Sequence, residues 1–272
     1  MPTSIDLVAT DLDGTFWGND GRCDARTLAA VDTLARRGVP VLIATGRRRR
    51  SAATGLAVND IELPAVLLNG CHGWDYARGE QFHLSPFDPD GAHAVVDLCA
   101  AADVSPVIYV DGDDPDCFAT PHCSTAAGHL AALAPHVAPT PDLHSIIEQH
   151  AVIGFAVLGL IGAEVHSLAE AVNSVEAGTA TTSVDHQYGD WSVMIQPHGV
   201  TKWNGIESFC RHRGLDPDRV LAVGDAGNDL GMLQAASVAV AIATAPDDVR
   251  AVADHLIAPP DQGGWAGLLD LI

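Results

Sequence analysis

Two aspartates with a single residue between them stand at the end of an apolar run. The stretch reads V8-A-T-D-L-D-G-T15, so Asp11 and Asp13 follow the run almost directly. Residues two apart in a strand point to the same side, which brings both carboxylates to one place. Like charges this close repel, and a divalent cation between the carboxylates and a phosphate would offset that repulsion. The spacing therefore indicates a site for a cation and a phosphorylated ligand.

A second acidic group follows another apolar run near the C-terminus. In V223-G-D-A-G-N-D229, Asp225, Asn228 and Asp229 come directly after the run Val220–Val223. The carboxyl ends of parallel strands lie at one edge of an open sheet, where ligands bind. Paired aspartates at a turn are also typical of Asx turns. Two acidic groups in equivalent places favour a shared site over two unrelated turns.

Two further polar stretches occupy comparable positions. Thr45-Gly46 follows the apolar run Val39–Ala44, and Thr201-Lys202 opens a helical pattern. The first of these is also typical of a helix N-cap. Lys202 is the only lysine among 272 residues, against thirteen arginines. This usage indicates that a compact ammonium, rather than a planar guanidinium, is needed at that position.

The elements that would position these residues alternate between strand and helix patterns. Apolar strand runs at 7–10, 39–44 and 65–68 are separated by amphipathic helix patterns, and the same order returns after residue 190. This order predicts an α/β fold with a Rossmann-like parallel sheet and helices on both faces. The middle of the chain has looser, proline-rich patterns, and we expect it to form a separate α+β domain. A strand predicted at 192–195 is assigned to the second half of the parallel sheet.

In order and spacing, the four polar stretches resemble the four motifs of the haloacid dehalogenase (HAD) superfamily of phosphohydrolases. The long segment between the second and third motifs resembles the insertion of the Cof-like sugar-phosphatase branch, which has a type IIB cap. The resemblance implies a discontinuous catalytic core at 1–83 and 190–272 with a cap at 84–189. It implies an enzyme, a phosphoric monoester hydrolase that acts on a small phosphomonoester, with a sugar phosphate as the expected substrate.

The resemblance also implies catalytic roles for three residues. Asp11 would be the nucleophile, which attacks phosphorus and forms an aspartyl-phosphate. Asp13 would be the general acid for the leaving oxygen and then the base for water. Lys202 would neutralise the charge of both the nucleophile and the phosphate. Phosphoryl transfer would then proceed by positioning and charge neutralisation.

A magnesium site and a phosphate site follow from the same resemblance. The Asp11 carboxylate, the Asp13 backbone carbonyl and Asp225 would bind Mg²⁺, and Asp229 would support these ligands from behind. The phosphate would be bound by Thr45, Gly46, Lys202 and Asn228. Arg47 and Asn69 would contact the substrate, although Asn69-Gly70 is equally typical of a simple turn. Arg48 to Arg50 fit either a positive collar around the site or a solvated surface.

Composition limits the partners. The formal charge of −21 argues against nucleic acid or an anionic membrane as the main partner. No apolar run approaches the ~18–20 residues of a membrane helix, and the N-terminal residues do not resemble a signal peptide. We therefore expect a cytoplasmic protein whose partner is a small phosphorylated metabolite.

Two other functions remain open at the level of sequence. A phosphomutase related to the phosphomannomutases would transfer the phosphoryl group to a sugar instead of water. A sugar-phosphate sensor would bind the same ligand without turnover, although none of the main catalytic groups is missing here. Phosphate release from a generic aryl phosphate separates these functions from a phosphatase.

Overall fold

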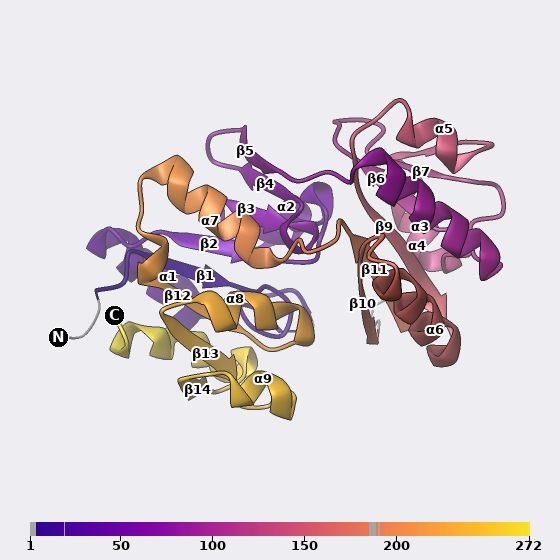
Figure 1. The fold of residues 1–272 in the computed structure, drawn as a ribbon. Coiled ribbons are helices and arrows are strands. Elements are labelled where there is room, and N and C mark those ends of the chain that lie inside the picture. Colours follow the sequence, from indigo (N-terminus) through magenta and orange to yellow (C-terminus); the bar gives the residue numbers. More distant parts are fainter. Residues whose placement is uncertain (1–3, 19, 185–188, 190) are drawn as a thin grey trace. The chain divides into compact units, whose positions relative to one another are not determined.

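The computed structural model describes residues 4–18, 20–184, 189 and 191–272 (Figure 1). The chain divides into two compact units. The first is formed by Met1–Leu84 with Thr201–Ile272, and the second by Ser85–Val200. The first unit is therefore discontinuous in sequence, and the second is inserted into it.

The first unit contains an eight-stranded sheet. Its strands are β1 (Leu7–Thr10), β2 (Val41–Ala44), β3 (Ala65–Leu67), β4 (His72–Asp75), β5 (Glu80–Leu84), β12 (Val220–Gly224), β13 (Val238–Ile242) and β14 (His255–Ile257). They lie in the order β14-β13-β12-β1-β2-β3-β4-β5. The first six are parallel, while β4 and β5 extend the sheet as an antiparallel hairpin. The predicted parallel sheet is confirmed, and the hairpin is an addition that the sequence patterns did not predict.

Helices connect these strands. They are α1 (Ala25–Arg37), α2 (Arg49–Val58), α7 (Lys202–Arg213), α8 (Leu230–Ala235) and α9 (Asp247–Ala251). Shorter 3-10 turns are η1 (Leu68–Gly70), η2 (Pro217–Arg219), η3 (Gly227–Asp229), η4 (Pro260–Gln262) and η5 (Gly264–Asp270). The Asp24 side chain accepts a hydrogen bond from the Arg26 N–H and so caps the start of α1. In the described part of the chain, no helix is both long enough and apolar enough to cross a membrane.

The strand residues alternate between two apolar layers. Val8 and Ile43 pack on the face covered by α1 and α2, whereas Leu7, Ala9 and Leu42 pack on the face covered by α7, α8 and α9. All five are buried. Burying a side chain such as Leu or Ile stabilises a fold by about 1.5–3 kcal/mol, so both layers hold the sheet rigidly. The prediction of helices on both faces is confirmed.

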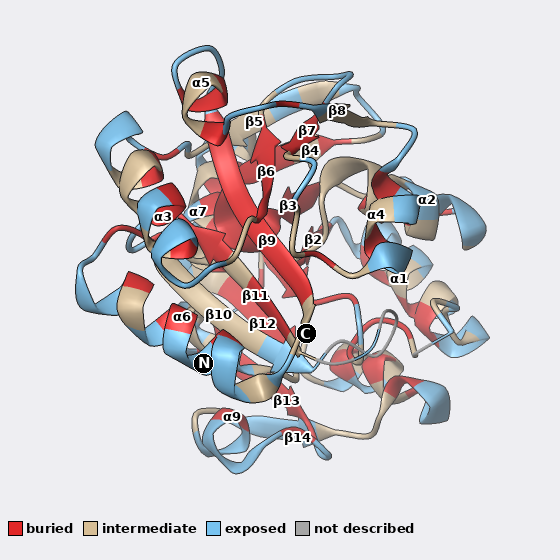
Figure 2. Cartoon of the chain, turned by 90° about the vertical axis from the view of Figure 1, so that its right-hand side faces the viewer, coloured by how far each residue is buried: buried red, intermediate tan, exposed pale blue. Residues whose placement is uncertain are grey.

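The second unit is a mixed six-stranded sheet with helices. Its strands are β6 (Val107–Val110), β7 (Cys117–Ala119), β8 (Val137–Pro139), β9 (Val152–Leu160), β10 (Thr179–Val184) and β11 (Trp191–Gln196), in the order β10-β11-β9-β6-β7-β8. Its helices are α3 (Pro89–Ala101), α4 (Ala127–Leu133), α5 (Leu143–Ile147) and α6 (Gly162–Ser174). Figure 2 shows the long strand β9 buried along most of its length. The predicted α+β insertion is confirmed as a fold.

One strand lies in a different sheet from the one expected. The sequence pattern predicts that the strand at 192–195 belongs to the parallel sheet, but β11 pairs antiparallel with β9 and β10 in the second sheet. The second unit therefore extends to Val200 rather than ending at residue 189. An apolar run indicates a strand but does not identify its partners, and the neighbouring β10 lies close enough in sequence to pair as a hairpin.

Candidate active site

Three parallel strands end at one edge of the first sheet. Strand β1 lies between β12 and β2, with Thr10 in register with Val223 on one side and Ile43 on the other. Asp11, Thr45 and Asp225 each follow the last residue of one of these strands. The sheet therefore brings the first, second and fourth motif to the same edge, as parallel pairing requires.

Lys202 joins this edge from the start of α7. Its Nζ donates a hydrogen bond of 2.6 Å to Asp11 Oδ1 and another of 2.6 Å to Asp229 Oδ1. The lysine side chain is completely buried. Burial by itself would lower the pKa of Lys202, but the Asp11 and Asp229 carboxylates raise it above the ordinary value. The ammonium is therefore held charged between two buried anions.

Asp225 faces Asp11 from the end of β12. The Thr15 hydroxyl donates a 2.6 Å hydrogen bond to Asp225 Oδ1. Gly14, at φ 84°, passes so close that a Cβ there would lie 2.5 Å from Asp225 Oδ2. Burial raises the pKa of Asp225 to about 6, against the hydrogen bond from Thr15. Gly14 therefore leaves room for the Asp225 carboxylate, and Thr15 orients it.

The arrangement of carboxylates suits a divalent cation. Oxygen atoms of Asp11, Asp225 and Asp229 lie within 4.8 Å of one another. Burial raises the pKa of Asp11 well above its ordinary value, although Lys202 opposes this. Hard cations such as Mg²⁺ prefer carboxylate oxygen, and a cation here would offset the desolvation of these carboxylates. The residues therefore fit a magnesium ion.

Asp229 differs from the other two carboxylates in its contacts. Its Oδ1 accepts the bond from Lys202, and its Oδ2 accepts bonds of 3.0 Å from the backbone N–H groups of Asp225 and Ala226. Both oxygens are therefore engaged by protein donors. This geometry orients Lys202 and the Asp225 backbone.

The residues expected at the phosphate site also meet. Asn228 Nδ2 donates a 3.0 Å hydrogen bond to Asn69 Oδ1, and a Cβ on Gly46 would lie 3.2 Å from that same oxygen. Asn69 is buried and has a left-handed backbone, with φ 54°. Its N–H donates to the Thr45 carbonyl at 3.0 Å. The ends of β2 and β3 are thereby tied together beside the acidic cluster.

Two side chains, Arg47 and Trp17, donate hydrogen bonds to the Asp13 carboxylate. Arg47 donates two hydrogen bonds of 2.7 Å, from Nε to Asp13 Oδ2 and from Nη2 to Asp13 Oδ1. Trp17 Nε1 donates a third, of 2.8 Å, to Asp13 Oδ1. The family resemblance implied a substrate contact for Arg47, whereas the sequence reasoning missed Trp17, because a tryptophan after the turn is typical of a core residue. In the structure its ring is buried while its N–H reaches the carboxylate.

The arginines after Arg47 begin the next helix. Arg48 precedes α2 as its N-cap, and α2 starts at Arg49. The Arg49 guanidinium lies over the Trp74 ring, 4.4 Å from its centre, which is a cation–π contact. Arg49 is therefore engaged with an aromatic ring of the same unit.

Two consecutive buried hydrogen bonds connect Trp265, through Thr10, to the backbone carbonyl of Asp11. Trp265 Nε1, in the C-terminal η5, donates to Thr10 Oγ1 at 3.0 Å, and Thr10 Oγ1 donates to the Asp11 carbonyl at 2.9 Å. Thr10 lies within an apolar run, and Trp265 lies far along the sequence. No sequence signal marks either residue as part of the site.

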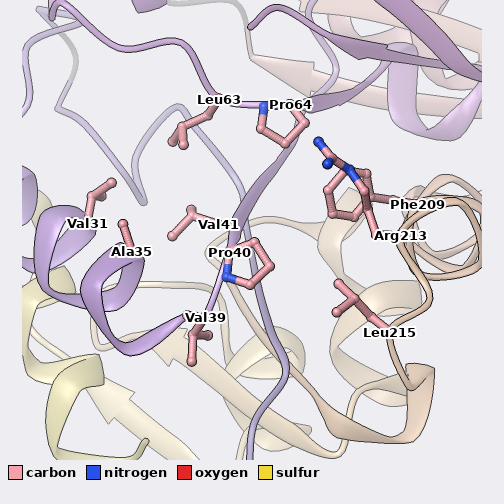
Figure 3. Close-up of a pocket in the computed structure, with 11 residues that line it drawn as sticks. Val31, Ala35, Val39, Pro40, Val41, Leu63, Pro64, Phe209, Arg213 and Leu215 are labelled. Carbon is pink, nitrogen blue, oxygen red and sulfur yellow. The ribbon is translucent and has the colours of Figure 1, made fainter. Parts of the chain in front are cut away.

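A cavity of about 390 Å³ lies elsewhere in the first unit. Figure 3 shows its lining, which includes Val31 and Ala35 from α1, Pro40 and Val41 at the start of β2, and Phe209 and Arg213 from α7. The lining is mostly apolar. Because β2 starts at this cavity and ends at Ala44, just before Thr45, the cavity lies at the opposite end of the strand from the acidic cluster.

Comparison with known proteins gives a family. A family model described as haloacid dehalogenase-like hydrolase matches residues 8–269. The phosphatase YitU of Bacillus subtilis, named for 5-amino-6-(5-phospho-D-ribitylamino)uracil, is 26% identical over 288 residues, covering 99% of this chain and 98% of that protein. The chloroplastic endoribonuclease YBEY of Arabidopsis thaliana is 28% identical over 282 residues, covering 95% of this chain. This chain spans 45% of that longer relative.

The fold has a counterpart among solved structures. The HAD subclass IIB sugar phosphatase BT4131 superposes with a TM-score of 0.73 at 21% identity, covering 98% of this chain and 100% of that one. The superposition covers both units, including the inserted one. The chain therefore belongs to the haloacid dehalogenase-like hydrolases and is a HAD-type phosphatase, and its fold is similar to that of the subclass IIB protein.

Proposed function

We propose that this chain hydrolyses a sugar-phosphate-sized monoester through an aspartyl-phosphate formed on Asp11. The observation that carries the proposal is the buried Lys202 ammonium, 2.6 Å from both Asp11 and Asp229, beside a third carboxylate at Asp225. Burying this many charges is expensive unless they are paired, and a binding site for a neutral ligand would not need them. The names of the relatives YitU and BT4131 support a phosphorylated, sugar-like substrate.

In the first step Asp11 attacks phosphorus. A new bond forms between an Asp11 oxygen and phosphorus, and the bond from phosphorus to the ester oxygen breaks. Asp13 gives its proton to that departing oxygen, so the leaving group departs as a neutral alcohol. In the second step Asp13 takes a proton from water as the water oxygen attacks phosphorus, and inorganic phosphate leaves Asp11.

Lys202 and the neighbouring polar groups hold the reactants. Lys202 offsets the negative charge of Asp11 and of the incoming phosphate together, which lowers their mutual repulsion. Thr45, Gly46 and Asn228 bind the phosphoryl oxygens, while Asn69 and Arg47 contact the substrate. The Asp229 carboxylate keeps Lys202 in place.

The metal site belongs to the same proposal. The Asp11 and Asp225 carboxylates and the Asp13 backbone carbonyl would hold Mg²⁺. When bound, the ion would supply positive charge that stabilises the phosphoryl group during transfer. Thr15 and Gly14 keep the Asp225 carboxylate directed at Asp11 for this purpose.

We further propose that residues 85–200 act as the cap and select the leaving group, while the first unit performs the chemistry. The support is that every catalytic residue named above lies in the first unit. A cap that closes over the substrate would keep water out of the first step.

The test is a screen for phosphate release over a panel of phosphorylated metabolites, with Mg²⁺ and with a chelator. We expect Mg²⁺-dependent release, a preference for sugar-phosphate-like esters, and loss of release in Asp11→Asn. Transfer of the phosphoryl group to an added sugar phosphate without free phosphate would indicate a phosphomutase. Binding of these ligands with no turnover under any condition would indicate a sensor, and either result would overturn the proposal.

A further inference from the structure

The Asp13 carboxylate receives three hydrogen bonds from two side chains. Oδ1 accepts two of them, from Trp17 Nε1 at 2.8 Å and from Arg47 Nη2 at 2.7 Å. Oδ2 accepts one, from Arg47 Nε at 2.7 Å. The two oxygens are therefore not equivalent, because Trp17 donates to Oδ1 and not to Oδ2, whereas Arg47 donates to both.

Trp17 and Arg47 differ in how firmly they are fixed. The indole of Trp17 is completely buried, whereas the Arg47 side chain is 28% exposed. The backbone around Trp17 is also pinned, since its N–H donates to the Leu12 carbonyl and its carbonyl accepts from the Gly14 N–H. A tight turn thus carries Asp13 and its tryptophan partner together. Arg47 has the longer and more exposed side chain, and its guanidinium also lies over the Trp17 ring, 5.3 Å from the ring centre.

Helix α2 makes room for the indole. A Cβ on Gly55 would lie 2.7 Å from Trp17 Cη2, closer than packed carbon atoms approach. Glycine within a helix is unfavourable relative to alanine, because it loses more backbone entropy on folding. The glycine at this position therefore has a packing reason, which is to let the indole lie where its N–H reaches Asp13.

We propose that Trp17 is a positioning residue for Asp13: its indole N–H fixes Oδ1 so that Oδ2 faces the ester oxygen and exchanges the proton. The inference rests on the proposed function, in which Asp13 is the general acid. A proton on Oδ2 weakens the hydrogen bond from Arg47 Nε, because a protonated carboxyl oxygen is a poorer acceptor than a carboxylate oxygen. Trp17 donates to the other oxygen and keeps the carboxyl group in orientation throughout.

The chemistry predicts a dependence on the leaving group. In the first step the Asp13 proton passes from Oδ2 to the ester oxygen as the P–O bond breaks. Phenol, with a pKa of about 10 like tyrosine, is a poor leaving group and needs that proton. 2,4-Dinitrophenol is a far stronger acid and leaves as the anion without it. A misplaced Asp13 therefore slows the first ester and spares the second.

The experiment compares kcat/KM for phenyl phosphate and 2,4-dinitrophenyl phosphate, with Mg²⁺ present. This ratio includes only the steps up to departure of the alcohol, so the later hydrolysis of the aspartyl-phosphate does not enter it. For Trp17→Phe we expect kcat/KM to fall about tenfold with phenyl phosphate and to stay within about twofold with the dinitrophenyl ester. Gly55→Ala, which keeps the indole but displaces it, should show the same selectivity.

Two controls separate the possible failures. Asp13→Asn should show the selectivity more strongly, by about 100-fold. Trp265→Phe removes the N–H of another buried tryptophan, and should change both esters by the same factor. Melting curves establish that each variant is folded at the assay temperature. If the wild type hydrolyses neither ester, the proposed function fails; if Asp13→Asn is selective while Trp17→Phe and Gly55→Ala are not, the role of Trp17 fails.

Discussion

The Lys202 ammonium neutralises part of a cluster of three carboxylates, of which Asp11 and Asp229 are buried and Asp225 is partly buried. Lys202→Met removes the charge and leaves Asp11 and Asp229 without their common partner. Breaking a buried ion pair from one side destabilises a protein by about 3–5 kcal/mol, so we expect a loss of this size at pH 7 without Mg²⁺. Urea unfolding measures it. Arg211→Met, which removes an exposed cation of the same helix, should change stability by no more than about 0.5 kcal/mol; equal effects of the two substitutions would contradict the assigned pairing.

The raised pKa of Asp225 predicts how stability depends on pH and Mg²⁺. Its pKa is about 6 in the folded chain against an ordinary value of 3.8, so the folded state holds this proton more tightly. The resulting stabilisation is complete below about pH 3.8 and is lost as the pH rises through 6, amounting to at most about 3 kcal/mol before solvent screening. Because Mg²⁺ would replace the proton, we expect it to raise the melting temperature more at pH 7.5 than at pH 5. Asp225→Asn should abolish that difference, and an equal Mg²⁺ effect at both pH values would count against the metal site.

A buried histidine gives a pH dependence of the opposite sign. Burial lowers the pKa of His72 from 6.5 to about 4, so the unfolded chain takes up this proton first. Stability from His72 is complete above pH 6.5 and is lost as the pH falls through about 4, by up to about 3 kcal/mol. Chemical unfolding at pH 7 and pH 5 should show a smaller loss in His72→Gln than in the wild type. The same loss in both proteins would exclude His72 as a source.

Polar residues of an unusual type at the end of an apolar run could be predicted as site residues. Residues whose role depends on a contact with a distant part of the chain could not. Asp11 and Asp225 could be identified because carboxylates directly after apolar runs have few structural uses, and Lys202 because no other lysine occurs. Trp17 and Trp265 look like ordinary core residues in sequence. Their roles depend on where one N–H points, which is set by packing against segments far away in the chain.

At the scale of elements, η1 is held against the start of α7. Gly70 has φ 115°, and a Cβ there would collide with the Thr201 carbonyl, one residue before Lys202. Gly70→Ala should therefore displace the start of α7 and lower kcat at least tenfold, in addition to the strain of a positive φ. Gly38→Ala is a matched control, because Gly38 has φ 78° with open space around it. We expect the control to lose stability, by about 1 kcal/mol, but not kcat; a similar loss of kcat in both would exclude the collision as the cause.

The elements themselves were predictable where their apolar patterns were long or regular. Strand β1 and helix α1 lie where the sequence patterns placed them, because an apolar run that is buried at every position marks the strand and a clear Asp24 cap marks the start of the helix. The hairpin β4–β5 was missed, since His72, Trp74 and Asp75 do not alternate in a regular apolar pattern. Strand β11 was predicted but placed in the wrong sheet, because pairing depends on partners that no local pattern specifies.

At the scale of the whole molecule, the formal charge of −21 repels a phosphorylated substrate. Salt screens such long-range repulsion, since the Debye length falls to about 10 Å at 0.1 M. We therefore expect kcat/KM for a dianionic phosphate ester to rise about two- to fivefold between roughly 20 and 200 mM KCl at constant Mg²⁺. The melting temperature should rise over the same range, because the charges on the chain also repel one another. A fall in kcat/KM with salt would instead indicate that the arginines after Thr45 dominate the local field.

The bonds that complete the site join residues from opposite ends of the chain. Lys202 and Asp11 are 191 residues apart, Asp225 and Thr15 are 210 apart, and Trp265 and Thr10 are 255 apart. A ribosome adds about 5–20 residues per second, so a nascent chain carries Asp11 for roughly ten seconds or more before Lys202 is made. Throughout that time the central strand β1 lacks its neighbour β12. A product terminated before residue 202 therefore cannot assemble this centre, and competence for turnover arises only after Lys202, Asp225 and Trp265 have been added.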